Sequence, residues 1–220
     1  MIKGAIFDVD GTVLDSMTIW EHAGEVYLKN LGIEPEAELG QRTFAMSMEE
    51  GAQYLKDTYG LSKSIAGILD DINGVIREFY CYRAPLKPGI RDYLDGLWEK
   101  GIRITVATST DRPLIEAAFA RLGIADYFEQ IFTCSEVGIG KQQPEIYHRA
   151  AAVMGTVPGE TLVFEDALHA IETADKAGYQ TVGVYDAFSL AKQEKIKELV
   201  KLYLMNFENF NGFWKTASAL

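Results

Sequence analysis

Short apolar runs recur along the chain, and stretches with helical periodicity separate most of them. The runs are rich in β-branched residues, which is typical of parallel strands buried on both faces. They lie at Ile2–Phe7, Ile102–Ala107, Gln130–Cys134, Thr161–Phe164 and Thr181–Tyr185, with a shorter one near Leu202–Met205. Helical patterns lie at about 90–100, 111–123, 145–154, 167–177 and 188–200. This alternation predicts an α/β fold with a doubly wound, Rossmann-like parallel sheet.

One long stretch breaks the alternation of strands and helices. From Met17 to Tyr82 the apolar positions follow helical spacing, with patterns at about 19–27, from Met48 to Tyr59 and from Ile65 to Phe79. The segment that follows, with prolines at 85 and 88, is stiff and helix-breaking, as a hinge would be. We therefore predict two domains: an α/β core of residues 1–15 and 86–220, and an all-α domain of residues 16–85.

Composition and charge narrow the class of protein. The 220 residues are 48% hydrophobic, enough for a buried core, and 21 Lys and Arg against 32 Asp and Glu give a net charge of −11. This charge repels nucleic-acid phosphates and anionic lipids, so we expect neither nucleic acid nor a membrane as a partner. Asp8 ends the first apolar run too early for an export signal. We expect a cytoplasmic protein with free thiols at Cys81 and Cys134. We also expect the aromatic tail, which contains Phe207, Phe210, Phe213 and Trp214, to cover the core.

Pairs of acidic residues follow two of the expected strands. Asp8 and Asp10 come directly after the first run, and Glu165 and Asp166 come directly after Thr161–Phe164. Open parallel sheets place their ligand crevice at the carboxyl ends of the strands. Two neighbouring carboxylates can share Mg²⁺, or divide the roles of nucleophile and acid/base. Either pair alone is also consistent with an ordinary turn or helix cap.

Two further polar sites fall at the same edge of the expected sheet. Thr108, Ser109 and Thr110 follow the run Ile102–Ala107 and precede a helix, a position that suits a phosphate. Lys141 lies in a glycine-rich loop before another helix. Clustered carboxylates repel one another unless a divalent cation lies among them. Together with Thr and Lys, such a cation forms a phosphoryl-transfer site.

These motifs resemble those of the haloacid dehalogenase superfamily, in the subgroup of phosphatases with a helical cap inserted after the first motif. The resemblance is closest to β-phosphoglucomutase-like and phosphoglycolate phosphatase-like members, and it covers essentially the whole chain. The four motifs run from Ile6 to Ser16, from Val106 to Thr110, from Lys141 to Pro144, and from Phe164 to Asp166 with a small-residue helix to Gly178. The resemblance implies a haloacid dehalogenase core with an all-α cap.

The resemblance also implies roles for the acidic residues in a Mg²⁺-dependent phosphatase of small phosphorylated metabolites. Asp8 would be the nucleophile that becomes an aspartyl phosphate, and a ligand of Mg²⁺. Asp10 would be the general acid and then the general base, and would bind the metal through its main-chain carbonyl. Asp166 and Glu165 would complete the metal site.

The remaining motif residues would bind the phosphoryl group. Thr108 would hold it through its hydroxyl, with the Ser109 N–H and Val9 assisting. Lys141 would neutralise charge on Asp8 and on the phosphoryl group. Trp20 and Arg42 of the cap are candidate contacts for the rest of the substrate, and we expect the enzyme to be a monomer.

Two departures from the family pattern bear on the activity. Gln142 and Glu145 replace a proline and an aspartate of the usual third motif. β-Phosphoglucomutases carry a histidine where this chain has Trp20, and His22 is two residues on, about 200° around a helix. A phosphomutase remains the alternative to the phosphatase. A phosphorylated switch protein and a dehalogenase are less consistent with the residues, because neither needs Asp10 as acid and base beside a second acidic pair.

Overall fold

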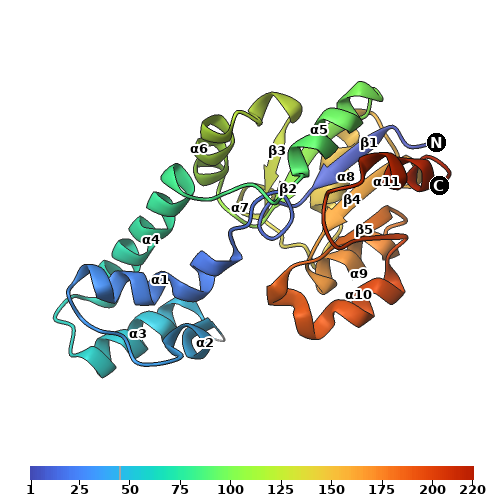
Figure 1. The fold of residues 1–220 in the computed structure, drawn as a ribbon. Helices are drawn as coiled ribbons and strands as arrows, with labels where there is room; N and C mark the ends of the chain where they lie inside the picture. The colour runs from blue at the N-terminus through green and yellow to red at the C-terminus, as the bar shows by residue number, and fades with distance from the viewer. Residues whose placement is uncertain (45) are drawn as a thin grey trace. The chain divides into compact units, whose positions relative to one another are not determined.

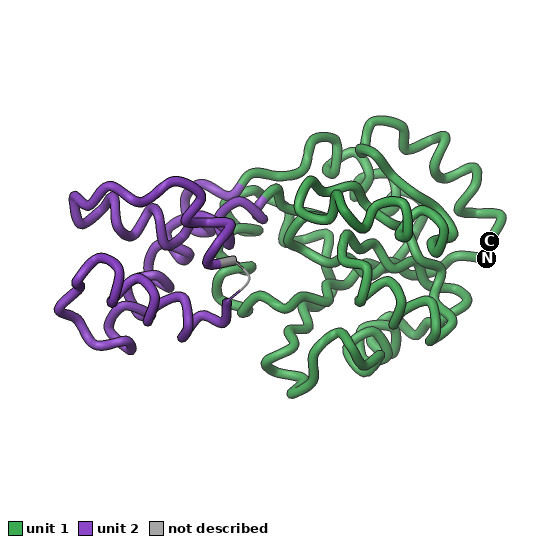
Figure 2. Tube along the Cα trace, turned by 90° about the horizontal axis from the view of Figure 1, so that it is seen from below, with its two compact units in different colours: residues 1–15, 85–220 green, residues 16–84 purple. Residues whose placement is uncertain are grey.

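The chain forms two compact units in the computed structural model, which describes residues 1–44 and 46–220, without the Phe44 side chain. Residues 1–15 and 85–220 form an α/β unit, and residues 16–84 form a helical unit (Figure 2). Across the described residues, none of the helices combines the length and apolar character that a membrane crossing requires. Cys81 and Cys134 are free thiols, as expected.

A six-stranded parallel sheet forms the centre of the α/β unit, in the order β3-β2-β1-β4-β5-β6 (Figure 1). Its strands are β1 (Gly4–Phe7), β2 (Arg103–Thr108), β3 (Ile131–Thr133), β4 (Thr161–Glu165), β5 (Gln180–Val184) and β6 (Leu202–Leu204). The strand order reverses between β1 and β4, where a doubly wound sheet opens its crevice. The structure confirms the predicted fold class, and all six strands lie where the sequence predicted them.

Helices precede, connect or follow the strands of this unit. They are α5 (Ile90–Glu99), α6 (Arg112–Leu122), α7 (Cys134–Val137), α8 (Glu145–Met154), α9 (Leu168–Lys176), α10 (Gln193–Leu199) and α11 (Phe210–Ala217), with short 3₁₀ turns at Ala125–Tyr127, Pro158–Glu160 and Ala187–Lys192. Pro113 in the first turn and Gly123 with a positive φ at the end mark α6, as the sequence indicates.

Aromatic side chains pack both within the core of the sheet and at its end. The Phe7 and Phe164 rings stack at 4.1 Å between centroids across the β1–β4 pair. The ring of Phe213, in the tail, packs against Phe164 with centroids 5.6 Å apart and against Tyr93 with centroids 5.2 Å apart. The tail therefore covers the core, as the sequence predicted.

The helical unit consists of α1 (Met17–Asn30), α2 (Leu39–Phe44), α3 (Met48–Tyr59) and α4 (Ile65–Tyr82). Helix α3 begins at a capping box in which Ser47 and Glu50 exchange hydrogen bonds, and Gly60 ends it in the left-handed conformation. Ser64 caps α4 through its side chain alone, which accepts a hydrogen bond from the Gly67 N–H. The apolar faces of α1 and α4 pack on one another. The apolar positions at helical spacing in the sequence therefore form a small core that belongs to this unit.

Candidate active site

The first acidic pair lies in a tight turn at the carboxyl end of β1. The main-chain oxygen of Val9 accepts hydrogen bonds from the N–H groups of residues 12, 13 and 14, which closes the turn. Gly11 adopts φ +83° and approaches the second acidic pair so closely that a Cβ there would lie 2.7 Å from Asp166 Oδ2. Only glycine fits this position, because of both the conformation and the space. The turn thus brings Asp8 and Asp166 together.

Lys141 joins the two acidic pairs by bridging two carboxylates. Its Nζ donates to Asp8 Oδ1 and, at 2.6 Å, to Glu165 Oε1. All three side chains are buried, with Lys141 only 5% exposed. Burial disfavours the ammonium, but the charges of Asp8 and Glu165 outweigh it and raise the pKa of Lys141 well above its ordinary value. The lysine is therefore a fixed positive charge at the centre of the site.

Asp8, Glu165 and Asp166 form a cluster able to hold a cation. Each offers a carboxylate oxygen, and the three oxygens lie within 4.8 Å of one another. Burial, opposed by Lys141 but reinforced by the neighbouring carboxylates, raises the pKa of Asp8 well above its ordinary value. Burial and the charges of Glu165 and Asp186 raise the pKa of Asp166 to about 8. Simultaneous ionisation of these carboxylates is unfavourable unless a cation offsets their negative charges.

One atom of this cluster points to such a cation directly. Glu165 Oε2 is buried and has no hydrogen-bond partner among the described residues. An unpartnered carboxylate oxygen in the interior is costly, and a cation would satisfy it. Carboxylate oxygens are the ligands that Mg²⁺ prefers, so the residues present fit the expected metal.

Asp10 and Thr108 lie beside this cluster, each fixed by Thr110. Thr110 Oγ1 donates to Asp10 Oδ2 at 2.7 Å, and the Thr110 N–H donates to Thr108 Oγ1 at 3.1 Å. Because Thr108 Oγ1 accepts this bond, its own proton remains for an oxygen of a ligand. Ser109 is exposed, and its Oγ lies 3.5 Å from Cys134 Sγ. Thr110 links the first and second motifs.

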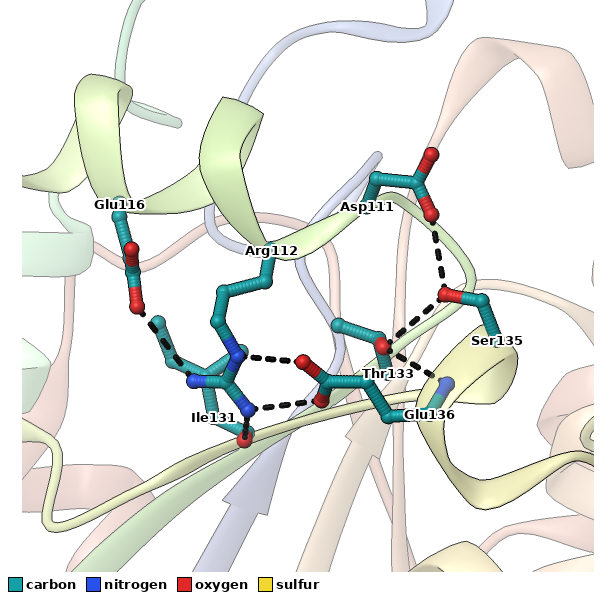
Figure 3. A network of polar contacts seen from close by, with 7 residues as sticks. All are labelled: Asp111, Arg112, Glu116, Ile131, Thr133, Ser135 and Glu136. Atoms are coloured by element: carbon teal, nitrogen blue, oxygen red, sulfur yellow. Dashed lines mark hydrogen bonds and ion pairs between the residues drawn. The ribbon is translucent and has the colours of Figure 1, made fainter.

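A polar network supports the loops that carry Thr108 and Lys141 (Figure 3). The Arg112 guanidinium, at the start of α6, donates twice to Glu136 of α7, at 2.6 and 2.7 Å, and once to the Ile131 carbonyl at 2.6 Å. Ser135 Oγ donates to Asp111 Oδ1 at 2.9 Å. Helix α6 follows the Thr108 loop and α7 precedes the Lys141 loop, so the network ties the two loops together.

Two residues that the sequence analysis missed, Tyr147 and Asp186, lie against the acidic cluster. Tyr147 of α8 donates its hydroxyl to Glu165 Oε1 at 3.1 Å. Burial, followed by the charge of Glu165, raises the pKa of this hydroxyl well above its ordinary value. Asp186, two residues after β5, is buried and paired with Lys87 at 2.6 Å. Asp186 was predictable, because ligand-binding residues of open parallel sheets lie just after the carboxyl ends of strands. A buried tyrosine on a helix, in contrast, is typical of an ordinary core residue.

The two candidate substrate contacts of the helical unit are held within that unit. Trp20 Nε1 donates to the Tyr80 hydroxyl at 3.1 Å. Arg42 is exposed, donates to the Tyr54 hydroxyl at 3.1 Å and lies 3.6 Å from Glu36. The structure therefore brings together Asp8, Lys141, Glu165 and Asp166 in one unit, and places Trp20 and Arg42 in the other.

Comparisons with known proteins agree with the fold. Residues 5–184 match the family described as haloacid dehalogenase-like hydrolase. Bacillus subtilis YhcW, provisionally named a phosphatase, is 29% identical over 186 residues, 83% of either chain. The phosphorylated carbohydrates phosphatase of Thermotoga maritima is 25% identical over 181 residues, 82% of this chain and 84% of its own. A solved Thermotoga maritima structure provisionally named β-phosphoglucomutase has a TM-score of 0.84 at 24% identity, covering 97% of this chain and 99% of that one. These findings confirm the resemblance predicted from the motifs.

Proposed function

Because the chain belongs to the haloacid dehalogenase-like hydrolase family and is a phosphoric monoester hydrolase, we propose that it hydrolyses a small phosphorylated metabolite through an aspartyl phosphate on Asp8, with Mg²⁺ as cofactor. The observation that carries the proposal is the buried bridge from Lys141 to Asp8 and Glu165. A lysine between two carboxylates, beside a third one, can support both a nucleophile and a bound phosphoryl group.

The metal site would consist of the carboxylates of Asp8, Glu165 and Asp166 and the main-chain carbonyl of Asp10. The unpartnered Glu165 Oε2 supports this assignment. When bound, Mg²⁺ supplies positive charge that stabilises ionised Asp8 and the oxygens of the phosphoryl group.

In the first step a carboxylate oxygen of Asp8 forms a bond to phosphorus while the bond from phosphorus to the alcohol oxygen breaks. The Thr108 hydroxyl and the N–H groups of the Ser109 and Val9 loops hold the phosphoryl oxygens. Lys141 offsets their charge. Asp10, oriented by Thr110 at 2.7 Å, gives its proton to the departing alkoxide.

In the second step Asp10 takes a proton from a water molecule, and the water oxygen attacks phosphorus. The bond from phosphorus to Asp8 breaks, inorganic phosphate leaves, and the Asp8 carboxylate is restored. Asp10 regains its proton, so the enzyme returns to its starting state.

The helical unit is proposed to act as a cap that excludes water and selects the substrate. Trp20 and Arg42 are candidate contacts for the part of the substrate that is not transferred. One relative is named as a phosphatase of phosphorylated carbohydrates, which favours a sugar phosphate as the substrate class. We further propose that the enzyme is a cytoplasmic monomer. The relatives named phosphatases do not favour the mutase alternative.

The test is a phosphate-release assay over sugar phosphates, phosphorylated hydroxy acids and nucleoside monophosphates. We expect Mg²⁺-dependent release by the wild type, no release by Asp8→Asn, and normal release by a control, Asp126→Asn, whose side chain is exposed. β-Glucose 1-phosphate with catalytic bisphosphate is included, and sugar isomers are followed. Release that survives complete chelation of Mg²⁺, or isomers formed without net phosphate release, would contradict the proposal.

A further inference from the structure

Tyr147 contacts the acidic cluster but has no part in the proposed reaction steps. It lies on the first turn of α8, six residues after Lys141, and its side chain is 1% exposed. Its hydroxyl donates to Glu165 Oε1 at 3.1 Å, and its ring packs against Tyr179 with centroids 5.9 Å apart. A hydroxyl this deeply buried is placed by the packing of its ring.

The hydrogen bond from Tyr147 determines which oxygen of Glu165 remains available. Oε1 already accepts from Lys141 at 2.6 Å, so the two donors occupy both acceptor positions of that oxygen. Oε2 is buried and is the oxygen without a partner in the part of the chain that the structure describes. The carboxylate is thus held at Oε1, and only Oε2 remains available to bind a ligand.

Lys141 alone would hold Glu165 less precisely. Its ammonium is a point charge with no preferred direction, and it is shared with Asp8. The Tyr147 hydroxyl, in contrast, is carried by a rigid ring in a packed position, and its bond gives the carboxylate a second, directional contact. Two fixed donors on one oxygen define the plane of the carboxylate.

We propose that Tyr147 is a positioning residue for the cation. It holds Glu165 so that Oε2 faces the bound Mg²⁺, and it thereby sets the Mg²⁺ affinity. The inference rests on the proposed function, because it needs the acidic cluster to be the Mg²⁺ site. Partners of metal ligands orient the ligand and commonly change metal affinity about 10- to 100-fold when removed.

The chain offers a matched control for this proposal. Tyr179 is equally buried, its ring packs on Tyr147, and its hydroxyl bonds with His148 Nδ1 at 2.9 Å and not with the acidic cluster. Tyr147→Phe and Tyr179→Phe therefore remove the same atom from neighbouring buried rings. Thermal unfolding without metal checks that both variants are folded.

The experiment is a calorimetric titration of Mg²⁺ into the substrate-free protein. We expect Tyr147→Phe to bind Mg²⁺ at least about tenfold more weakly than the wild type, and Tyr179→Phe to stay within about twofold. Equal weakening in both variants, or unchanged affinity in Tyr147→Phe, would overturn the inference. A wild type that binds no Mg²⁺ would overturn it as well.

A double-mutant cycle asks whether Tyr147 acts through Glu165. In the Glu165→Gln background we expect Tyr147→Phe to change Mg²⁺ affinity less than about twofold. A persistent tenfold loss there would assign the effect to another contact and overturn the inference. The proposed function fails by a different result, the absence of phosphate release by the wild type, so the two failures are distinguishable.

Discussion

The acidic edge of the α/β unit and the helical unit use charged residues in opposite ways. At the acidic edge the charges are buried and shared, since Lys141 serves two carboxylates that are 9% exposed or less. In the helical unit the ion pairs are exposed, as in Arg42 with Glu36 and Lys63 with Asp71. Buried charges are costly to separate and exposed ones are not. Substitutions of the buried charges at the acidic edge should therefore lower both stability and activity, whereas substitutions of the exposed ion pairs in the helical unit should change stability little.

The largest expected effect comes from Lys141→Met, which leaves two carboxylates buried without their cation. Removing one partner of a buried ion pair costs about 3–5 kcal/mol. We expect the free energy of unfolding in urea to fall by that order without Mg²⁺, by less with Mg²⁺, and phosphatase activity to be lost. Lys215→Met, at an exposed position of α11, is the control. Unchanged unfolding of Lys141→Met would contradict the contrast between the two regions.

The next effect is that of Asp10→Asn, which removes the proposed proton donor and acceptor and leaves Asp8, the proposed nucleophile, in place. General acid–base catalysis contributes about 10²- to 10⁴-fold, so we expect kcat to fall by this order. Phosphorylated Asp8 should accumulate, as detected by mass spectrometry of the acid-quenched enzyme. Thr110→Val, which removes only the hydrogen bond to Asp10, should have a smaller effect of the same kind. Normal turnover of Asp10→Asn would remove its proposed role.

A smaller effect is expected in the helical unit from Trp20→Ala. If this unit selects the substrate, kcat/KM should change about tenfold relative to the wild type for some phosphorylated substrates and not for others. The hydrogen bond from Trp20 to Tyr80 suggests a control, Tyr80→Phe, which removes that bond and keeps the Trp20 ring. A uniform fall of activity over all substrates in both variants would mean that Trp20 acts only through the fold.

The smallest effect tests whether burial, rather than membership of the α/β unit, determines how much unfolding free energy is lost when an ion pair is broken. Glu136 is 46% exposed and pairs with Arg112. We expect Glu136→Gln to lower the free energy of unfolding by only about 0.5 kcal/mol. A loss comparable with that of Lys141→Met would refute the role of burial.

The same pair has a defined pH dependence. The hydrogen bonds from Arg112 lower the pKa of Glu136 below its ordinary 4.5. The unfolded chain therefore binds this proton at higher pH than the folded chain does, so the stabilisation is complete above about pH 4.5 and is lost as the pH falls through the lowered pKa. The difference between wild type and Glu136→Gln should shrink over that range. The exposed Glu198→Gln serves as the control.

The sequence predicted those parts of the molecule that a regular backbone determines. Parallel strands bring their carboxyl ends to one edge, so the positions of Asp8, Lys141, Glu165 and Asp166 along the chain were enough to predict that they meet. Tyr147 was not predictable, because its role depends on one hydrogen bond from a helix that otherwise looks like ordinary core.

Short or tightly packed elements also escaped prediction. Helix α2 has six residues, too few for helical periodicity to identify. Helix α11 was expected only as an aromatic tail, since its aromatic content masks the helical spacing. Its Phe210 packs so closely on Gly96 of α5 that a Cβ there would lie 2.3 Å from the ring. Such a contact between residues 114 positions apart is a property of the fold and not of either segment.

The position of β1 at the centre of the sheet also has a consequence for synthesis on the ribosome. Gly4 pairs with Arg103 on one side and with Thr161 on the other. Both partners of the strand are therefore translated long after it, whereas residues 16–84 complete a unit of their own in the interval. A nascent chain shorter than 161 residues carries an apolar strand with an unpaired edge, the kind of segment that aggregates. The helical insertion can fold during synthesis, but Asp8, the proposed nucleophile next to β1, is held in place only when most of the chain has emerged.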